Sequence, residues 1–407
     1  MIQPPEPDLT PDQMLARARA LRPTLRENQG RCEAEGRVPQ DVNDQLVEAG
    51  FYRIVQPRRF GGYEFDVPTF YRVMMELARG CPETAWVLAL TAGHPMLLAS
   101  YPEAAQVEAY GVDGEFRGPA SFSPPGQAKA VDGGYLVTAG WVSASGIDIG
   151  THFIGMAMAA PENEGAPPSP IQVILERGQF EIIDDWKVMG MQGTGSKQVR
   201  VNDAFVPSHR TVPTMGSARG SQAIPAARLY DNPMYQGRIQ PFLIGEATAV
   251  AVGAARGALD IYEQSLKGKT SMFPPFLERT EDPEFQAHYG RALALIATAE
   301  AALVRAGEDF MAYAAEAAGG GEPFGEEREL GLTLVEQQCV RLAWEAMELI
   351  FRTAGTSASA KSGAAIGRIF RDMAVINTHP ALQLDRTAVA AAKARFKPPE
   401  EGSPPDS

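Results

Sequence analysis

The residues best suited to bind an aromatic ligand stand in two short segments near the middle of the chain. The segment SFSPPGQ places Phe122 and Ser123 before a rigid Pro-Pro-Gly turn. The segment AGWVSASG places Trp141, Ser143 and Ser145 at alternate positions, which predicts one shared face of a strand. A flat ring beside hydroxyl groups suits a planar heteroaromatic ligand. The alternative is a strand whose tryptophan lies in the core and whose serines lie at an edge.

A candidate proton-transfer residue interrupts the last helical segment, RDMAVINTHPALQLD. His379 precedes Pro380 near its centre, and it is the one ionisable side chain between Asp372 and Asp385. A histidine titrates near neutral pH and can hold or transfer a proton. The alternative is a histidine at a helix end or a subunit contact that makes an ordinary hydrogen bond.

Two more candidates lie in strongly apolar segments. His94 stands between a glycine and a proline, which would end the buried helix there and expose the imidazole to a cavity. The alternative is a core histidine with satisfied hydrogen bonds. Glu246 is a lone carboxylate in PFLIGEATAVAVGAA, where burial is costly unless the group is paired or protonated. It is either a base or the partner of an arginine in a neighbouring helix.

The spacing of the histidines does not predict a metal site. The chain contains no HExxH and no Glu-x-x-His pair of di-iron type, and the five histidines lie in separate segments. We therefore expect no metal. The five residues are His94, His152, His209, His288 and His379.

Composition excludes several classes of partner. The chain has 407 residues, 44% of them hydrophobic, and a formal charge of −13, which argues against nucleic acid or an anionic membrane as a partner. The most apolar run falls short of a membrane span of ~20 residues. Cys32, Cys81 and Cys339 show no CxxC spacing, and three thiols cannot form a disulfide framework. We expect a cytoplasmic protein.

The pattern of apolar residues predicts an α+β chain in three parts. Helical spacing fills residues 1–115, and Thr10, Pro11 and Gln13 form a capping box at the start of the first helix. Short alternating strands with Gly and Pro turns in 116–215 suggest a small antiparallel β-barrel or sandwich. Long helical patterns in 216–397 predict a four-helix bundle. The Pro-rich segment 398–407 is expected to be a disordered tail.

These motifs resemble, in order, those of the acyl-CoA dehydrogenase superfamily. SFSPPGQ resembles its flavin loop and WVS its flavin strand, while WKVMGMQGTGSKQVRVNDAFVP and RIFRDMAVINTHPALQ resemble later segments. The resemblance spans roughly residues 10–395. It implies an α-helical N-terminal domain, a middle antiparallel β-barrel and a C-terminal four-helix bundle.

The chain departs from the dehydrogenases at the position of their catalytic glutamate. Pro380 occupies that position, and its neighbour is His379. SLKGKTSMF replaces an Arg-x-x-Phe-Gly stretch that many dehydrogenases use to hold FAD. A divergent branch is more similar: the oxygenase components of two-component flavin-dependent monooxygenases, of the p-hydroxyphenylacetate hydroxylase, steroid phenol hydroxylase and dibenzothiophene monooxygenase type.

Membership of this branch implies diffusible reduced FMN or FAD, O₂ as co-substrate, and hydroxylation of a small phenolic substrate through a flavin C4a-hydroperoxide. It also implies a separate NAD(P)H-dependent flavin reductase and a homotetramer. His379 would face the flavin, Ser145 would lie near its N5 atom, and His94 would line the cavity. Phe122, Ser123, Trp141 and Ser143 would complete the flavin site. The resemblance does not decide between FMN and FAD. It also leaves open whether the substrate is oxidised at carbon, nitrogen or sulfur.

Two rival functions follow from the same residues. The first is an acyl-CoA dehydrogenase with bound FAD that uses Glu246 as its base. The second is a catalytically inactive relative that serves as a binding scaffold.

Overall fold

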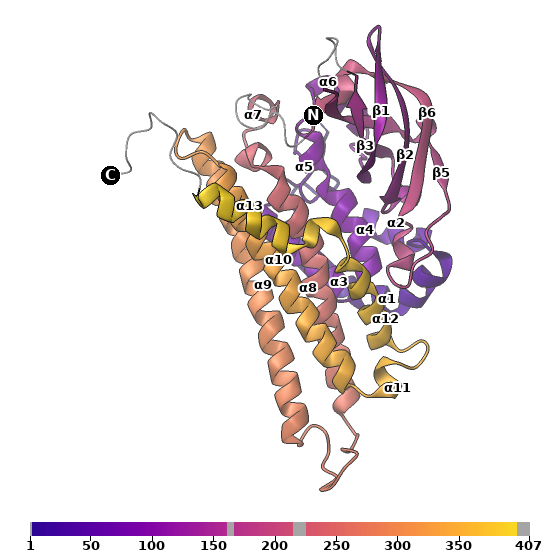
Figure 1. Ribbon diagram of the computed structural model, residues 1–407, viewed down its shortest axis with the longest axis vertical. Helices are drawn as coiled ribbons and strands as arrows, with labels where there is room; N and C mark the ends of the chain where they lie inside the picture. Colours follow the sequence, from indigo (N-terminus) through magenta and orange to yellow (C-terminus); the bar gives the residue numbers. More distant parts are fainter. Residues whose placement is uncertain (1, 161–166, 215–224, 397–407) are drawn as a thin grey trace.

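The computed structural model describes residues 2–160, 167–214 and 225–396 (Figure 1). The sheet lies at the upper right of the view, and the long C-terminal helices extend down to the bottom of the view. Helices α3 and α4 lie between these two parts, and each contacts α8. The predicted acyl-CoA dehydrogenase-like fold, with helices, then a sheet, then helices, is confirmed.

The N-terminal part begins at the predicted capping box. The Thr10 hydroxyl accepts the Gln13 N–H at 3.3 Å, and the Gln13 side chain accepts the Thr10 N–H at 2.8 Å. The helix ends at Gly36, whose φ of 61° is left-handed. The helices of this part are α1 (Pro11–Glu35), α2 (Gln40–Glu48), α3 (Val67–Ala78), α4 (Pro82–Gly93), α5 (Pro95–Leu98) and α6 (Glu103–Tyr110).

The middle part is one seven-stranded sheet in the order β5-β6-β2-β1-β3-β4-β7. Its pairs are antiparallel except for β1 with β3, which are parallel, so the prediction of a purely antiparallel barrel is wrong in that pair. Among the described residues no hydrogen-bond ladder joins the edge strands β5 and β7. The strands are β1 (Ala120–Val131), β2 (Gly134–Ala144), β3 (His152–Ala159), β4 (Ser169–Glu176), β5 (Glu181–Ile183), β6 (Lys197–Pro207) and β7 (Thr211–Pro213).

The C-terminal part contains three long helices and a fourth that is broken. Pro380 has no N–H and its ring would clash with the carbonyl one turn earlier, which favours a break in the helical pattern at this position. A short turn, η7 (Pro380–Leu382), separates α12 (Ala365–Ile376) from α13 (Leu384–Phe396). The other helices are α7 (Ala226–Leu229), α8 (Ile239–Leu266), α9 (Pro283–Ala318), α10 (Glu326–Thr353) and α11 (Thr356–Ser359).

Helix α8 is the centre of this part. It is the one described helix long and apolar enough to cross a membrane by length and composition, yet 89% of its most apolar window is buried inside the protein. It is therefore a core helix. The tail predicted for 398–407 lies outside the described residues.

Candidate active site

Strands β1 and β2 bring the two predicted ligand-binding segments side by side. The Ser121 hydroxyl donates to the carbonyl oxygen of Val142 at 2.5 Å. Beyond Ser121 the chain bulges out of the sheet. Ser121 pairs with Gly155 of β3 and Gly126 pairs with Ala157, so β1 advances five residues where β3 advances two. Ser123 is exposed on this bulge, whereas Phe122 is half-buried against the main hydrophobic core. The bulge thus presents a hydroxyl and backbone groups beside the end of β2.

The predicted shared face of Trp141, Ser143 and Ser145 is wrong. The pairing of β2 with β6 shifts after Trp141, and Ser143 has a left-handed φ of 60°. An extra residue of this kind reverses which side chains point to each face. Trp141 is fully buried and donates its indole N–H to Met156 O at 2.7 Å, while Ser143 is exposed. The Trp141 ring therefore supports the strand from within the sheet core.

Ser145 instead lies in a buried network with α4. Trp86 donates its indole N–H to the Ser145 hydroxyl at 3.1 Å. The Ser145 hydroxyl is 2.7 Å from that of Ser196, which is 2.6 Å from that of Thr194. Thr194 ends the short turn η4 (Gln192–Thr194), which leads into β6. Three distant segments therefore meet at one serine.

His379 joins the same group through Trp86. Their ring centroids are 5.8 Å apart with planes at 66°, an edge-on contact. The His379 Nδ1 accepts the Ala381 N–H at 3.3 Å, so in the neutral ring the hydrogen is on Nε2. The surrounding protein lowers the pKa of His379 below its ordinary 6.5, although the residue keeps an exposed surface. His379 is therefore neutral at physiological pH, and its Nε2–H has no hydrogen-bond partner among the described residues.

His94 and Glu246 form a separate, buried pair at the other end of α4. The His94 Nδ1 is 2.5 Å from Gly118 O, a carbonyl that can only accept, so Nδ1 carries a hydrogen. Its Nε2 faces Glu246 Oε1 at 3.6 Å. Neither Glu246 oxygen has a hydrogen-bond partner among the described residues. Burial raises the pKa of Glu246 to about 7, and His94 opposes this shift.

This pair settles where two predicted residues lie. His94 is not exposed to an open cavity, because only 4% of the residue is accessible. Glu246 faces a histidine rather than an arginine. Gly93 allows the approach, since a Cβ at that position would lie 2.0 Å from Glu246 Oε2. Through Gly118, the pair supports the start of β1.

Helix α12 fixes the loop that carries the hydroxyl network. The Asp372 carboxylate accepts the Met191 N–H at 2.7 Å, and Arg371 donates to Met189 O at 2.9 Å. Glu33 of α1 pairs with Arg371 and with Arg368, the latter at 2.7 Å. Two motifs more than 170 residues apart in the sequence are thus one structural unit beside the site.

One grouping of described residues has atoms suited to a metal ion. Cys32, Cys81 and Glu83 are buried, and their ligand atoms lie within 4.8 Å of one another. The spacing analysis misses it because Cys32 lies in α1, far in the sequence from Cys81 and Glu83 at the start of α4. The Thr84 hydroxyl donates to the Cys81 sulfur at 3.3 Å, and Glu83 accepts the Gly193 N–H at 2.8 Å. The bond from Gly193 to Glu83 holds the η4 loop against α4.

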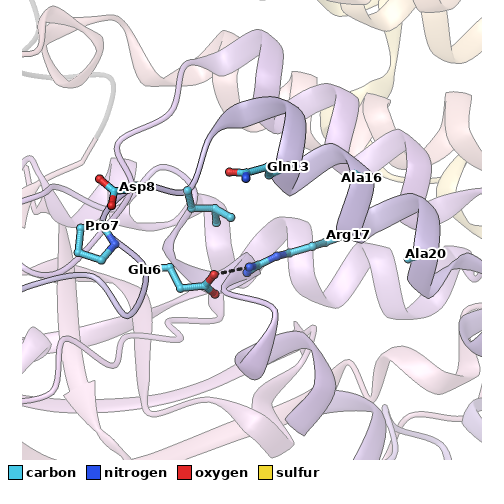
Figure 2. Close-up of a pocket in the computed structure, with 8 residues that line it drawn as sticks. Glu6, Pro7, Asp8, Gln13, Ala16, Arg17 and Ala20 are labelled. Carbon is cyan, nitrogen blue, oxygen red and sulfur yellow. Dashed lines mark hydrogen bonds and ion pairs between the residues drawn. The ribbon is translucent and has the colours of Figure 1, made fainter.

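A hollow in the described structure lies away from these residues. A pocket of about 670 Å³ near the N-terminus is lined by Leu9 and other residues of the first helix and its approach (Figure 2). Its one charged contact is the ion pair of Glu6 with Arg17 at 2.6 Å. It contains none of the predicted site residues.

Sequence reasoning misses three members of the site. Trp86 reads as a core residue of an apolar helix, and it is buried, but its N–H and ring edge connect Ser145 to His379. Thr194 and Ser196 lie in the Gly-rich stretch MGMQGTGSKQV, whose available signal is two hydroxyl residues immediately before a strand. That signal is too common to indicate a site without the fold.

Comparison with known proteins identifies relatives of the whole chain. Residues 13–111 match the acyl-CoA dehydrogenase N-terminal domain and residues 246–384 its C-terminal domain. The oxygenase subunit HsaA of a flavin-dependent monooxygenase from Rhodococcus jostii (strain RHA1) is 30% identical over 386 residues, which is 94% of this chain and 98% of that protein.

Two further relatives agree. The oxygenase component of an FADH(2)-dependent resorcinol hydroxylase from Rhizobium sp. (strain MTP-10005) is 30% identical over 277 residues, 67% of this chain and 66% of that protein. The crystal structure of 3-HSA hydroxylase from Rhodococcus sp. RHA1 matches with a TM-score of 0.85 at 29% identity, covering 94% of this chain and 96% of that one. The chain therefore belongs to the acyl-CoA dehydrogenase superfamily, within the family of flavin-dependent monooxygenase oxygenase components.

Proposed function

We propose that this chain hydroxylates a small phenolic substrate with O₂ and a reduced flavin, FMN or FAD, that a separate NAD(P)H-dependent reductase supplies. The observation that carries the proposal is the contact of His379 with Trp86, which in turn donates to Ser145. An imidazole, not a carboxylate, therefore stands beside the residues expected to hold the flavin.

The residues present fit a flavin. The exposed bulge at Ser123 and the exposed Ser143 lie on neighbouring strands, tied together by the bond from Ser121 to Val142. Ser145 directly follows β2, and one acceptor position of its hydroxyl has no partner among the described residues. Backbone groups and hydroxyls of this kind suit the polar edge of an isoalloxazine. When bound, the reduced flavin supplies the electrons that activate O₂.

The chain's own residues would control hydrogen bonding and protons around the flavin. Neutral His379 offers the hydrogen on Nε2 to an oxygen atom placed beside it. Its lowered pKa keeps that form dominant at neutral pH. Trp86 holds the imidazole edge and orients Ser145. His94 and Glu246 would act at a distance, by holding the start of β1.

The substrate class and the reductase rest on the relatives. One relative is the oxygenase component of an FADH(2)-dependent resorcinol hydroxylase. Another is the oxygenase subunit of a flavin-dependent monooxygenase. Resorcinol is a phenol, and a phenolic ring is rich in electrons and prone to oxygen transfer. An oxygenase component requires a second component that delivers reduced flavin.

We further propose a homotetramer assembled through the C-terminal helices. The loop from α8 to α9 carries three exposed large apolar side chains, Met272, Phe273 and Phe276. At the opposite end of these helices, α13 exposes Val389 and Phe396. Exposed apolar groups at both ends of the C-terminal helices favour protein contacts there. Light scattering after size exclusion tests the proposal, and a monomeric mass would refute it.

The test of the function is anaerobic reduction of FMN or FAD, mixing with the protein, and exposure to O₂ with a panel of phenols. We expect the protein to purify nearly colourless and to form hydroxylated product only when reduced flavin is added. A yellow protein that bleaches with an acyl-CoA would identify a dehydrogenase instead. A protein that binds neither oxidised nor reduced flavin would be a scaffold.

The dehydrogenase alternative finds little support in the geometry. Its base would be Glu246, yet this carboxyl group is fully buried and faces His94. The position of a family glutamate in the last loop holds Pro380, which cannot accept a proton.

A further inference from the structure

The hydroxyl groups around Ser145 form a chain in which each hydrogen position follows from its neighbour. Thr194 Oγ1 lies 2.7 Å from Met191 O, a carbonyl that can only accept, so Thr194 donates to it. A hydroxyl carries one hydrogen, so Ser196 must donate to Thr194 across 2.6 Å. By the same rule Ser145 donates to Ser196 across 2.7 Å. All three hydrogens therefore point away from Ser145, toward Met191.

Ser145 is left with acceptor capacity alone. One of its lone pairs accepts the Trp86 N–H at 3.1 Å. The other has no partner among the described residues, and the single hydroxyl hydrogen is already committed to Ser196. A group placed beside Ser145 gains a hydrogen bond only if it brings a donor. A bare acceptor there would meet a lone pair in a buried setting, which is unfavourable.

The direction of the chain is resistant to reversal. Thr194 and Ser196 are 2% and 3% exposed, so water cannot readily re-pair their hydroxyls. Met191 is held through its N–H by Asp372 at 2.7 Å, and Thr194 O accepts the Gly146 N–H at 2.9 Å. Reversal would remove the short Thr194 hydroxyl bond from the Met191 carbonyl, which would keep only the Trp186 indole N–H at 2.9 Å and the Thr194 N–H at 3.3 Å.

We propose that Thr194 and Ser196 make the site selective for reduced over oxidised flavin by holding the Ser145 hydroxyl as an acceptor. This inference rests on the proposed function, which puts Ser145 against the flavin. The central ring of a reduced isoalloxazine carries N–H, whereas the corresponding nitrogen of the oxidised ring is a bare acceptor. Thr194 and Ser196 are positioning residues, because they act on the flavin only through Ser145.

The experiment measures dissociation constants of FMN and FAD in both redox states, under anaerobic conditions, for four proteins. Thr194→Val and Ser196→Ala interrupt the chain and release the Ser145 hydrogen to face the ligand. Thr194→Ser keeps the hydroxyl and is the matched control. We expect the unaltered chain and Thr194→Ser to prefer reduced flavin. In the other two variants this preference should fall about tenfold, because oxidised flavin gains one hydrogen bond with Ser145 and reduced flavin loses one.

The outcomes separate the inference from the function it rests on. If the unaltered protein binds no reduced flavin, the proposed function itself fails. If it prefers reduced flavin and Thr194→Val retains the full preference, only the inference fails, and equal losses in Thr194→Ser and Thr194→Val would also overturn it. Melting temperatures of the flavin-free proteins show whether each variant folds. Should Thr194→Val fail to fold, Ser196→Ala gives the same test through the neighbouring bond.

Discussion

Helix α4 carries a candidate functional group at each end, and the two ends use different chemistry. At the Trp86 end, a neutral indole, three hydroxyls and a carbonyl form hydrogen bonds whose donors and acceptors are all assigned. At the other end, about 12 Å along the helix, His94 faces the buried carboxyl group of Glu246. Both carboxyl oxygens of Glu246 lack a hydrogen-bond partner among the described residues.

The difference teaches where this protein is sensitive to pH. Neutral hydroxyls do not titrate near pH 7, so the hydrogen bonds among the three hydroxyls do not change over the physiological range. A titratable group at this end is Glu83, which accepts the Gly193 N–H beside Thr194 and whose pKa burial raises to about 7. At the second end, burial raises the pKa of Glu246 to about 7, so this carboxyl group titrates in the physiological range. The other described groups that interact with Glu246 include Tyr71, which also contacts Glu336, and neither of these is positive. Loss of the proton from the pair therefore leaves a buried negative charge without a cation.

The largest effect should come from His379, which stands next to the first end. Its replacement by Asn removes the imidazole from the site, and hydroxylation should fall between about 100-fold and 10,000-fold. The melting temperature should not change, because the residue lies on an exposed turn. His209→Asn, a histidine paired with Glu108 on the surface, is the control and should keep full activity. Unchanged turnover in His379→Asn would remove this residue from the mechanism.

The pH dependence of turnover adds a second check on His379. The protein atoms around the imidazole lower its pKa although the residue keeps an exposed surface, so the neutral form should persist below pH 6.5. Turnover that depends on this form should stay constant down through pH 6.5 and be lost only at lower pH. A loss centred well above pH 6.5 would require a different group.

Glu246→Gln should remove the pH sensitivity of the second end. The folded-state pKa of about 7 lies above the ordinary 4.5, so the protonated form stabilises the fold. That contribution is complete below pH 4.5 and is lost as pH rises through 7, by about 3 kcal/mol in the free energy of unfolding. The difference between the unaltered chain and the Gln variant, from denaturant unfolding at pH 5 and pH 8, isolates this term. Equal slopes against pH would show that Glu246 is not the group responsible.

Gly93→Ala tests the close approach on which the second end depends. The new Cβ would lie 2.0 Å from Glu246 Oε2 and 3.1 Å from Phe242, so the carboxyl group must move away from its place. We expect a loss of about 1–3 kcal/mol in the free energy of unfolding. Gly290→Ala in α9 is the control: its Cβ meets nothing within 4 Å, and it should stabilise the helix by about 0.5–1 kcal/mol.

The smallest effect should come from Trp86→Phe. The variant keeps a ring against His379 but loses the N–H that Ser145 accepts, a cost of about 1 kcal/mol. Affinity for reduced flavin should change only a few-fold. Trp141→Phe, which loses a similar bond to Met156 inside the sheet core, should lower the melting temperature and leave flavin affinity as it was. A larger effect on flavin from Trp141→Phe would restore the stacking role that its sequence suggests.

Much of the fold can be predicted because local chemistry specifies it. The capping box at Thr10, the alternating strands and the long apolar helices each depend on residues a few positions apart. The break at Pro380 is local as well, because a proline disfavours the interior of a helix. The parallel pairing of β1 with β3 is not local, because it is set by the path of the chain between them.

The candidate site also has features that the sequence determines and features that only the fold decides. By itself, the sequence determined that His379 precedes a helix-breaking proline in place of a carboxylate, and that Glu246 is a solitary acid in an apolar helix. Only the tertiary structure decided that Glu246 faces His94, that Trp141 turns into the core, and that Thr194, Ser196 and Trp86 meet at Ser145. The physical reason is that a hydrogen bond between distant segments depends on positions to within a few tenths of an ångström. No periodicity or spacing in one sequence carries that information.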